Sequence, residues 1–570
     1  MRGTFFGIEI AKTGLMLSQL GLDVTGHNIA NVETRGYTRQ RIIQTAYDPS
    51  FNIGKVLPVM QARVGAGTRV KILDQIRSAY LDRRFRTENQ ANKYWETRTR
   101  ELRYLESFFD NVNEETSINY SIARLFNAMK ILAEDAVEGA PRKLMQTAGL
   151  DLVQQLNTIY SGLMDLQSTQ NEAVNINVSE INRIATELVE LNKAIYGFEL
   201  TGHVANDLRD KRNVLLDDLS GFIEVEYTEY TDKWGATAMK VSIAGHTLVD
   251  HDTRFVLGVR EEYNAIPGEQ KVSIPIWESY IDKTGFPVKT HPDYPELGDD
   301  LDMNSVRFGE LKALMDMRDN DDVLLPGIPR YVQMLNDLAR ALVQQVNAVH
   351  EKGYNDPPIG PSTNGIKFFS DDAGWIYRNG AGDTLRKNAA GEWVDIDGVV
   401  VPDPVADGYD HLFDIAEITA KNIRLDDLIM ESEFNIACSS VQIRKRDDPE
   451  GQQRGNNENM NDLFRLFNLT DISLTVSGRD VAVGSFDSFA TSIRFDIGNT
   501  LFISGNMDDT SRTLTLSAEN QRMSVSGVSL DEEMTNLIKY NHAYNGASRV
   551  ITAMDDALDR LINGTGRVGL

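Results

Sequence analysis

Residues 29–40 read Ile-Ala-Asn-Val-Glu-Thr-Arg-Gly-Tyr-Thr-Arg-Gln and mark the point where a long amphipathic segment ends. Asn31, Thr34 and Gly36 favour a turn, because Asn and Thr side chains bond the local backbone and glycine accepts positive φ without steric cost. The stretch holds no nucleophile–base pair and no set of metal ligands. Its residues alone predict a helix end followed by a polar loop, which we call the hinge (residues 29–40). An aromatic face and polar side chains follow the turn, at Tyr37, Arg39 and Gln40.

The segment before the hinge, residues 4–32, is predicted to be a helix with a seven-residue repeat. Large apolar side chains recur at every seventh position and smaller ones lie three residues further on, a pattern typical of a coiled-coil face. A parallel line of glycines weakens the helix, each by about 1 kcal/mol relative to alanine, so we expect it to form on packing. The large line is Ile8, Leu15, Leu22 and Ile29, the small line is Ala11, Ser18 and Thr25, and the glycines are Gly7, Gly14 and Gly21.

The other end of the chain carries a matching helix. Ser529 to Glu532 form a capping box, and the acidic residues that follow suit the positive end of a helix. Gly564 is expected to stop the helix. Its apolar positions can be buried only against a partner, and the matching repeat lies at the other terminus. The two lines are Leu530, Leu537, Tyr544, Ile551 and Leu558, and Tyr540, Ala547, Met554 and Leu561.

Between the ends, helical periodicity alternates with period-two segments. Helices are expected over 76–110, 117–134, 141–166, 172–198, 206–220, 309–317 and 331–352, with a break at Pro326 to Pro329. Strands are expected over 222–305 and 366–425, and a hairpin near Gly478. The predicted fold is a multidomain α+β chain with helical ends, a mainly α-helical rod domain and inserted β-rich domains. The domain boundaries are 1–45 with 525–570, 46–220 with 309–353 and 485–524, 221–308, 354–440, and a mixed connecting segment 441–484.

Composition limits the class of protein. The 570 residues carry a net charge of −26, although residues 1–110 hold 17 Lys and Arg against 11 Asp and Glu. The basic residues there alternate with acidic ones, so we interpret them as a solvated helix face, and the acidic remainder disfavours nucleic acid and anionic membranes as partners. No apolar run reaches the length of a membrane span, and the start of the chain lacks the features of a cleaved secretory signal. The single cysteine, Cys438, is expected to be a buried apolar residue.

A few sequence features resemble cofactor-binding or metal-binding motifs, but the residues around them do not support those functions. Residues 564–569 spell GxGxxG but have no strand before them and no helix after them, as a dinucleotide site requires. Asp395 to Gly398 resemble the start of a calcium loop but lack its terminal acidic ligand, so a turn is favoured. His27 and His542 lie on the terminal helices, where packing or a polar surface position is favoured over metal binding. We therefore expect no catalytic, metal or cofactor site and no enzymatic activity.

The hinge then provides a family resemblance. Ala30 to Tyr37 resemble the Ala-Asn-x-x-Thr-x-Gly-Tyr signature of the flagellar axial proteins, which comprise rod, hook and hook-associated proteins. Thr38 to Gln40 narrow the resemblance to the hook-associated branch at the first junction between hook and filament. Two positions depart from the signature: Arg35 stands where a proline is usual and Thr38 where a serine is usual, and losing the proline frees one φ angle. Residues 526–540 are similar to the C-terminal signature of the family, and 206–220 and 309–320 resemble further blocks, whereas 225–305 and 370–425 show little resemblance.

This resemblance implies a structural, self-assembling protein. The terminal helices would pair as a coiled coil inside a tubular ring, the rod domain would form the wall, and the β-rich domains would lie outside. It implies further copies of the chain, hook protein, the second junction protein and an export chaperone at the C-terminal helix as partners, and export to the extracellular flagellum without a cleaved signal. Alternatives are another axial protein, such as a hook or rod component, or a secreted enzyme displayed on an axial scaffold. The residues expected to serve assembly are Ile8, Leu15, Leu22, Ile29, Asn31, Thr34, Gly36, Tyr37, Arg39, Gln40, Leu530, Leu537, Tyr544, Ile551 and Leu558.

Overall fold

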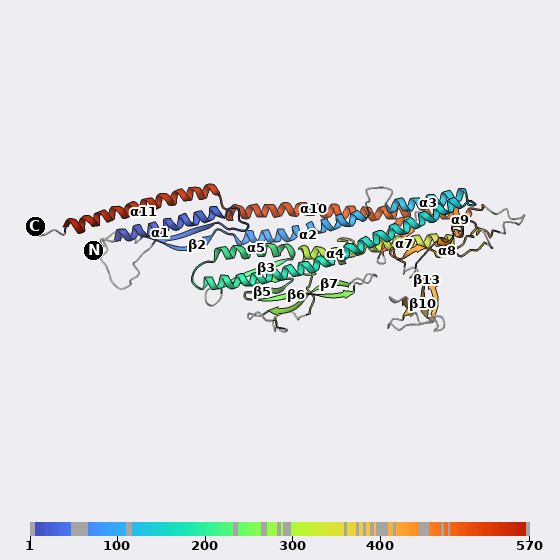
Figure 1. Cartoon of the computed structure of the whole chain (residues 1–570), viewed down its shortest axis with the longest axis horizontal. Coiled ribbons are helices and arrows are strands. Elements are labelled where there is room, and N and C mark those ends of the chain that lie inside the picture. The colour runs from blue at the N-terminus through green and yellow to red at the C-terminus, as the bar shows by residue number, and fades with distance from the viewer. Residues whose placement is uncertain are drawn as a thin grey trace.

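Figure 1 shows an elongated molecule in which long helices run along one axis and two groups of strands project from one side. The start of α1 and the end of α11 lie at the same end. The fold is a multidomain α+β arrangement in which helices predominate. The helices are α1 Phe6–Ala30, α2 Ala79–Phe109, α3 Ile118–Glu134, α4 Gly139–Glu199, α5 Asn206–Phe222, α6 Glu310–Asp319, α7 Ile328–His350, α8 Asp427–Glu431, α9 Glu458–Arg465, α10 Phe486–Ser526 and α11 Leu530–Thr565. This computed structural model describes residues 6–46, 67–109, 117–231, 237–263, 271–281, 287–288, 298–357, 362–371, 375–379, 384–387, 393–394, 409–413, 418–443, 455–468, 472–476 and 479–565.

The longest element is α4, a continuous helix of 61 residues that spans about 90 Å. The prediction of two helices, 141–166 and 172–198, was therefore wrong. Two polar residues between the predicted helices, Gln167 and Gln170, lie on the buried face of α4. The Gln167 amide donates to the backbone oxygen of Arg318 over 2.9 Å, and Gln170 is 1% exposed. Without a Pro or Gly between 166 and 172, the backbone has no reason to stop.

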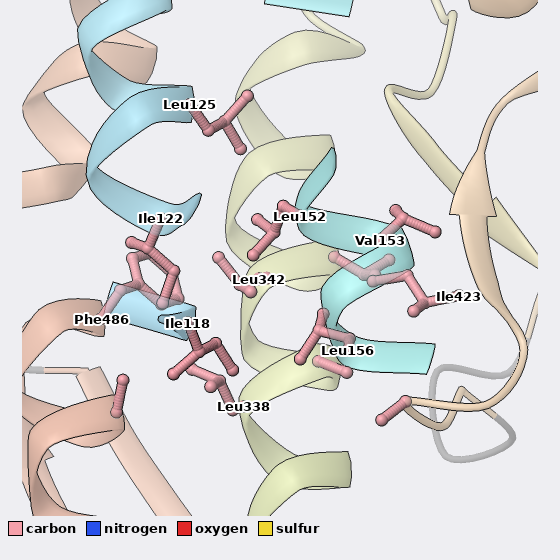
Figure 2. Close-up of a cluster of buried hydrophobic side chains, with 14 of the residues drawn as sticks. Ile118, Ile122, Leu125, Leu152, Val153, Leu156, Leu338, Leu342, Ile423 and Phe486 are labelled. Atoms are coloured by element: carbon pink, nitrogen blue, oxygen red, sulfur yellow. The ribbon is translucent and has the colours of Figure 1, made fainter. Parts of the chain in front are cut away.

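The first half of α4 belongs to the larger of two hydrophobic cores. Figure 2 shows how α3, α4 and α7 meet there with the start of α10. Helical spacing places one apolar face of each element toward the same centre, and all of the side chains labelled in Figure 2 are buried. These side chains are Ile118, Ile122, Leu125, Leu152, Val153, Leu156, Leu338, Leu342, Ile423 and Phe486.

The second half of α4 packs with α5 and α6 against a six-stranded sheet, ordered β3-β4-β5-β6-β7-β8. Every neighbouring pair is antiparallel, as period-two segments joined by short turns predict. The fully buried Trp277 of β7 belongs to this second core. The strands are β3 Val225–Thr231, β4 Thr237–Ile243, β5 His246–Asp250, β6 Thr253–Tyr263, β7 Lys271–Ile281 and β8 Pro287–Val288.

The remaining strands form smaller sheets. One has the order β12-β11-β10-β13, and the pairs β1-β2, β14-β9 and β15-β16 are each two-stranded. The antiparallel β15-β16 pair, with Val476 opposite Arg479, confirms the predicted hairpin near Gly478. These strands are β1 Gln40–Ala46, β2 Thr68–Gln75, β9 Phe369–Asp371, β10 Trp375–Asn379, β11 Thr384–Lys387, β12 Trp393–Val394, β13 Tyr409–Phe413, β14 Ile423–Leu425, β15 Ile472–Val476 and β16 Arg479–Gly484.

Two boundaries differ from the prediction for a local reason. Helix α7 begins at Ile328, so Pro329 lies in its first turn. Proline is tolerated there because the first-turn N–H groups have no partner within the helix. Helix α11 runs to Thr565 and includes Gly564, which was predicted to end it. The predicted break at Pro326 to Pro329 is therefore shorter, and the last helix longer, than the sequence indicated.

Candidate assembly interface and hinge

The first and last helices, which we call the terminal pair (α1 and α11), lie side by side (Figure 1). A Cβ on Gly21 would lie 2.5 Å from the Tyr540 ring, one on Gly14 would lie 4.0 Å from Ala547, and one on Gly7 would meet Met554. Each contact advances by seven residues on α1 while falling by seven on α11. The pair is therefore antiparallel, and Gly7 and Gly21 allow its close approach, because a Cβ at either position would clash with α11.

The large apolar side chains that repeat every seven residues on α1 and α11 lie beside this contact and are at most half-buried. Ala11, Ser18 and Thr25 are buried on α1. Over residues 530–563 of α11, one narrow stripe is half-buried and the other side chains are exposed, except at Glu533. Leu530 is 49% exposed. The half-buried members are Ile8, Leu15, Leu22 and Ile29 of α1 and Leu537, Tyr544, Ile551 and Leu558 of α11.

Asn28 joins the terminal pair to the hinge. Its amide donates to the Gln40 backbone oxygen over 2.9 Å, and its side-chain oxygen accepts from the Gln40 N–H over 3.0 Å. The same amide donates to Glu533 over 3.1 Å, one further step along the register of the glycine contacts. Asn28 is 1% exposed, so its bonds fix where the chain turns back.

Arg39 links the hinge to the start of α11. Its Nε donates to Glu533 over 2.7 Å and its Nη1 to Glu532 over 2.5 Å. The Glu533 side chain is 2% exposed and that of Glu532 is 60% exposed, so Glu533 carries the buried half of the contact. The Arg39 N–H also donates to the Ser526 oxygen, at the end of α10. Glu532, which the sequence assigned to a capping box, thus contributes to the hinge.

Thr38 and Gln40 attach the hinge to the start of α5. The Thr38 hydroxyl and N–H donate to the two carboxylate oxygens of Asp210 over 2.7 and 2.9 Å. Burial raises the pKa of the Asp210 carboxyl, and the bonds from Thr38 oppose that rise. Gln40 donates to Asp207 over 2.9 Å. The hinge therefore holds the terminal pair against the helical part of the chain.

Tyr37 bridges α1 and the hinge. Its hydroxyl donates to the Asn28 side-chain oxygen over 2.8 Å and lies 2.9 Å from Nδ1 of His27. Burial, aided by the nearby Asp207 carboxylate, raises the pKa of the Tyr37 hydroxyl, which therefore stays protonated. His27, for which the sequence favoured packing or a polar surface position over metal binding, packs edge-on against the Tyr37 ring.

The turn itself has the predicted chemistry. Asn31 donates to the His27 backbone oxygen over 2.9 Å, and Thr34 donates to the Asn31 side chain over 3.2 Å. Gly36 has a φ of 77°, and a Cβ there would lie 2.1 Å from Val214. Glycine is required for both reasons. Arg35, which replaces the usual proline, pairs with Asp218 of α5.

Sequence reasoning missed the partners of the hinge. Asn28, Asp210 and Glu533 are distant in sequence, and a polar residue inside an amphipathic helix gives no sign of which loop it will meet. A second missed cluster lies beside the hinge, where Asp217 of α5 pairs with Arg86 over 2.7 Å and with Arg522 of α10 over 2.5 Å. Arg522 also stacks on Phe85 at 4.0 Å. Only the fold brings these residues together.

The described residues also test the other sequence predictions, which concern metal binding, membrane spans and Cys438. Among them, no group of three or more His, Cys, Asp or Glu side chains could hold a metal ion, and no helix is both long and apolar enough to cross a bilayer. Cys438 is buried, as predicted, and burial raises its thiol pKa to about 11. The calcium-like residues 395–398 and the end of the GxGxxG segment lie outside the described residues.

Comparison with known proteins gives consistent matches. Residues 102–369 match the model "Flagellar hook-associated protein FlgK helical domain", and residues 519–564 match "Flagellar basal body rod FlgEFG protein C-terminal". Flagellar hook-associated protein 1 of Bacillus subtilis is 25% identical over 99% of both chains. The Salmonella typhimurium protein of the same name is 24% identical over 98% of this chain and 99% of its own length. The structure of the flagellar hook junction protein FlgK from Burkholderia pseudomallei superposes with a TM-score of 0.54, over 79% of this chain and all of that one, at 13% identity.

Proposed function

Because the chain belongs to the flagellar hook-associated protein 1 family, we propose that it forms the junction between the hook and the filament of a bacterial flagellum. Many copies would assemble into a tubular ring that adapts one polymer to the next. The family is structural, and we propose that this chain likewise is not an enzyme. The alternative of a hook or rod component is not favoured, because the full-length relatives are hook-associated proteins.

One observation carries this proposal: the terminal pair is incompletely buried. The α11 helix has 36 residues, and only a narrow stripe of it contacts α1. Leu530, Met534 and Ile538 are each about half exposed and share one helix face by their spacing. An apolar surface of this kind marks an interaction site. Assembly would bury it, as a coiled-coil layer does.

We propose that the domains occupy the positions in the ring that the family resemblance implies. Residues 1–45 with 525–570 would line the inside of the ring as a coiled coil. The helical rod domain, 46–220 with 309–353 and 485–524, would form the wall. The β-rich inserts 221–308 and 354–440 would lie outside, and 441–484 would connect them. The projection of the strands from one side of the long helices in Figure 1 supports this division.

The proposed partners are further copies of the chain, hook protein and the second hook–filament junction protein. An export chaperone would bind the C-terminal helix before assembly and cover the exposed apolar residues Leu530, Met534 and Ile538. The proposed location is the extracellular flagellum, reached without a cleaved signal peptide. The proposed assembly residues are the large apolar lines of the terminal pair together with six hinge residues. They are Ile8, Leu15, Leu22, Ile29, Leu530, Leu537, Tyr544, Ile551 and Leu558 in the helices, and Asn31, Thr34, Gly36, Tyr37, Arg39 and Gln40 in the hinge.

Electron microscopy of isolated hooks mixed with this protein tests the proposal. We expect the full-length chain to cap hook ends and a chain lacking 529–570 to leave them bare. Uncapped hooks in the presence of folded, full-length protein would overturn the assignment.

A matched pair of α1 variants distinguishes loss of the α1–α11 contact from a general effect of replacing a glycine in α1. Gly21→Ala places a methyl group against the Tyr540 ring, whereas a Cβ at Gly26 meets nothing within 4 Å. We expect Gly21→Ala to reduce hook capping and Gly26→Ala to preserve it. Equal capping by both variants would show that the α1–α11 contact is dispensable for the junction.

A further inference from the structure

Helix α10 has an exposed apolar face. Phe495 is 75% exposed and Phe502 is 69% exposed, and Leu516 and Met523 are each about half exposed. The four side chains are separated by multiples of seven residues, so they lie along one face of the helix. Figure 1 shows α10 along the side of the molecule away from both groups of strands. Large apolar side chains gathered on an open face mark an interaction site.

Two glycines lie on the same face. Gly498 and Gly505 come three residues after Phe495 and Phe502, the spacing that completes a coiled-coil seam. Among the described residues, a Cβ at either glycine would meet nothing within 4 Å. Each glycine costs the helix about 1 kcal/mol relative to alanine, and each leaves room for the backbone of another helix. The face, which we call the α10 seam, consists of Phe495, Gly498, Phe502, Gly505, Asp509, Arg512, Leu516, Glu519 and Met523.

The α10 seam is complementary in shape to a second, antiparallel copy of itself. In an antiparallel pair, seven residues forward on one helix match seven residues back on the other. Placing Leu516 of one copy opposite Gly505 of a second copy therefore also places Met523 opposite Gly498. Both large side chains then meet a glycine, so the two backbones approach closely while the side chains fill the space between them.

The same register pairs opposite charges at the middle of the seam. Asp509 and Arg512 are both exposed, and Asp509 of each copy lies opposite Arg512 of the other. The contact is symmetric, so this pairing occurs twice. Parallel copies in register would instead place Asp509 beside Asp509 and Arg512 beside Arg512, and like charges reject such a partner. Charge therefore selects the antiparallel arrangement.

The register also brings Phe502 to a groove beside the hinge. Phe502 lies opposite Glu519, which is between Leu516 and Met523 in the seam, and these three residues line a groove of about 420 Å³. The Glu519 carboxylate pairs with Arg522 of its own helix over 2.7 Å, so its charge is already neutralised. The apolar lining of the groove also includes Val32, Phe85, Val214 and Val528. An aromatic ring therefore has an apolar space to enter.

We propose that two copies of the chain pair antiparallel through their α10 seams, each inserting Phe502 into the groove beside the hinge of the other. Both copies use the same patch, so the contact is isologous and closes at two chains. The inference goes beyond the proposed function. Copies in one ring all point the same way, so the antiparallel pair is a state of the chain outside the ring. It covers the apolar face of α10 before assembly.

Sedimentation equilibrium of the full-length chain tests the pair and its register. We expect a dimer in the unmodified chain, and an association constant about tenfold or more lower in D509R and in R512D, because each variant sets like charges against each other twice. The chain with both changes should recover the dimer, since opposite charges face each other again. D462R is the control, because it makes the same charge change at an exposed ion pair with Arg465 in α9, outside the seam.

Cysteine crosslinking reads the orientation. We expect an intermolecular disulfide on oxidation of a mixture of L516C and G505C chains, because facing positions bring the two sulfurs within reach. G505C chains alone should stay uncrosslinked, and the native Cys438 is buried. A disulfide between two G505C chains would indicate a parallel contact and overturn the proposal, as would a double charge variant that fails to recover. An unmodified chain that caps hooks but stays monomeric would overturn the dimer and leave the junction function intact.

Discussion

The rod and the terminal pair are both helical, yet they reach different degrees of burial. In the rod, Leu152, Leu338 and Leu342 are fully buried, and α3, α4, α7 and the start of α10 share one core (Figure 2). In the terminal pair, Leu15 and Leu537 are half-buried and α11 meets one helix along a stripe. The difference teaches that a seven-residue pattern predicts a helix with an apolar face, while the number of neighbours decides how much of that face is covered. The rod has its neighbours within the chain, and we propose that the terminal pair finds the rest in other copies.

The largest contrast is expected from leucine-to-alanine substitutions. Leu342→Ala should lower the free energy of unfolding by about 2–5 kcal/mol, because it opens a cavity in a closed core. Leu15→Ala should cost the free chain much less, since water already reaches that side chain. Urea denaturation of both variants measures the difference. Equal losses would mean that the terminal pair is as well packed as the rod.

Acid should weaken the rod through His350. This side chain is fully buried at the end of α7. The Ala437 N–H donates to its Nε2 over 2.9 Å, so Nδ1 carries the hydrogen and donates to the Ile366 oxygen over 2.7 Å. Burial lowers the His350 pKa to about 4. The neutral ring therefore supports the fold fully above pH 6.5, and about 3 kcal/mol is lost as the pH falls from 6.5 to 4.

The free energy of unfolding measured between pH 4 and 7 checks this expectation. It should depend less steeply on pH in His350→Gln than in the unmodified chain. Asp337 has the opposite sign: burial raises its pKa to about 6, so its contribution is present at low pH and is lost as the pH rises through 6. Repeating the series in an Asp337→Asn background isolates the histidine. An unchanged slope in His350→Gln would remove His350 as the cause.

The hinge should show a smaller and more local effect. Glu533→Gln removes the buried charge that Arg39 and Asn28 bond, and should cost about 1–3 kcal/mol. Glu532→Gln, at an exposed carboxylate that bonds the same arginine, should cost less than about 1 kcal/mol. Hydrogen exchange resolved along the chain should place the Glu533→Gln loss in α11 and the hinge, with α4 and α7 unaffected. Matching losses in the two variants would contradict the burial difference.

The smallest effect is expected on α1 itself. Gly26→Ala should stabilise the helix by about 0.5–1 kcal/mol, while Gly21→Ala should lose that gain to the clash with Tyr540. Hydrogen exchange of residues 6–30 in the free chain measures both changes. Because the glycine line weakens α1, we also put forward the hypothesis that the terminal helices are largely disordered in the free chain and fold on assembly, and the same exchange data test it. Strong protection of α1 in the free, unmodified chain would contradict that hypothesis.

Much of the fold could be predicted, because it follows from local patterns. The helical ends, the glycine line, the antiparallel strands of 222–305 and the β15-β16 hairpin all leave a periodic signal. The length of α4 was missed because residues 167–171, Gln-Ser-Thr-Gln-Asn, interrupt the apolar pattern, and only the fold shows that Gln167 and Gln170 are buried. Likewise, the sequence marked Gly36, Tyr37, Arg39 and Gln40, but it could not show what each would bond.

By itself, the sequence determined the two heptad helices, the turn at Gly36 and the resemblance to flagellar axial proteins. Only the tertiary structure decided that the glycine line of α1 faces Tyr540, Ala547 and Met554, and that Asn28 and Arg39 both bond to the buried Glu533. The physical reason is range. Helix periodicity and turn chemistry depend on residues that are close together in the sequence. The contact between Arg39 and Glu533 joins residues almost 500 positions apart, and its partners are selected by the packing of all the helices between them.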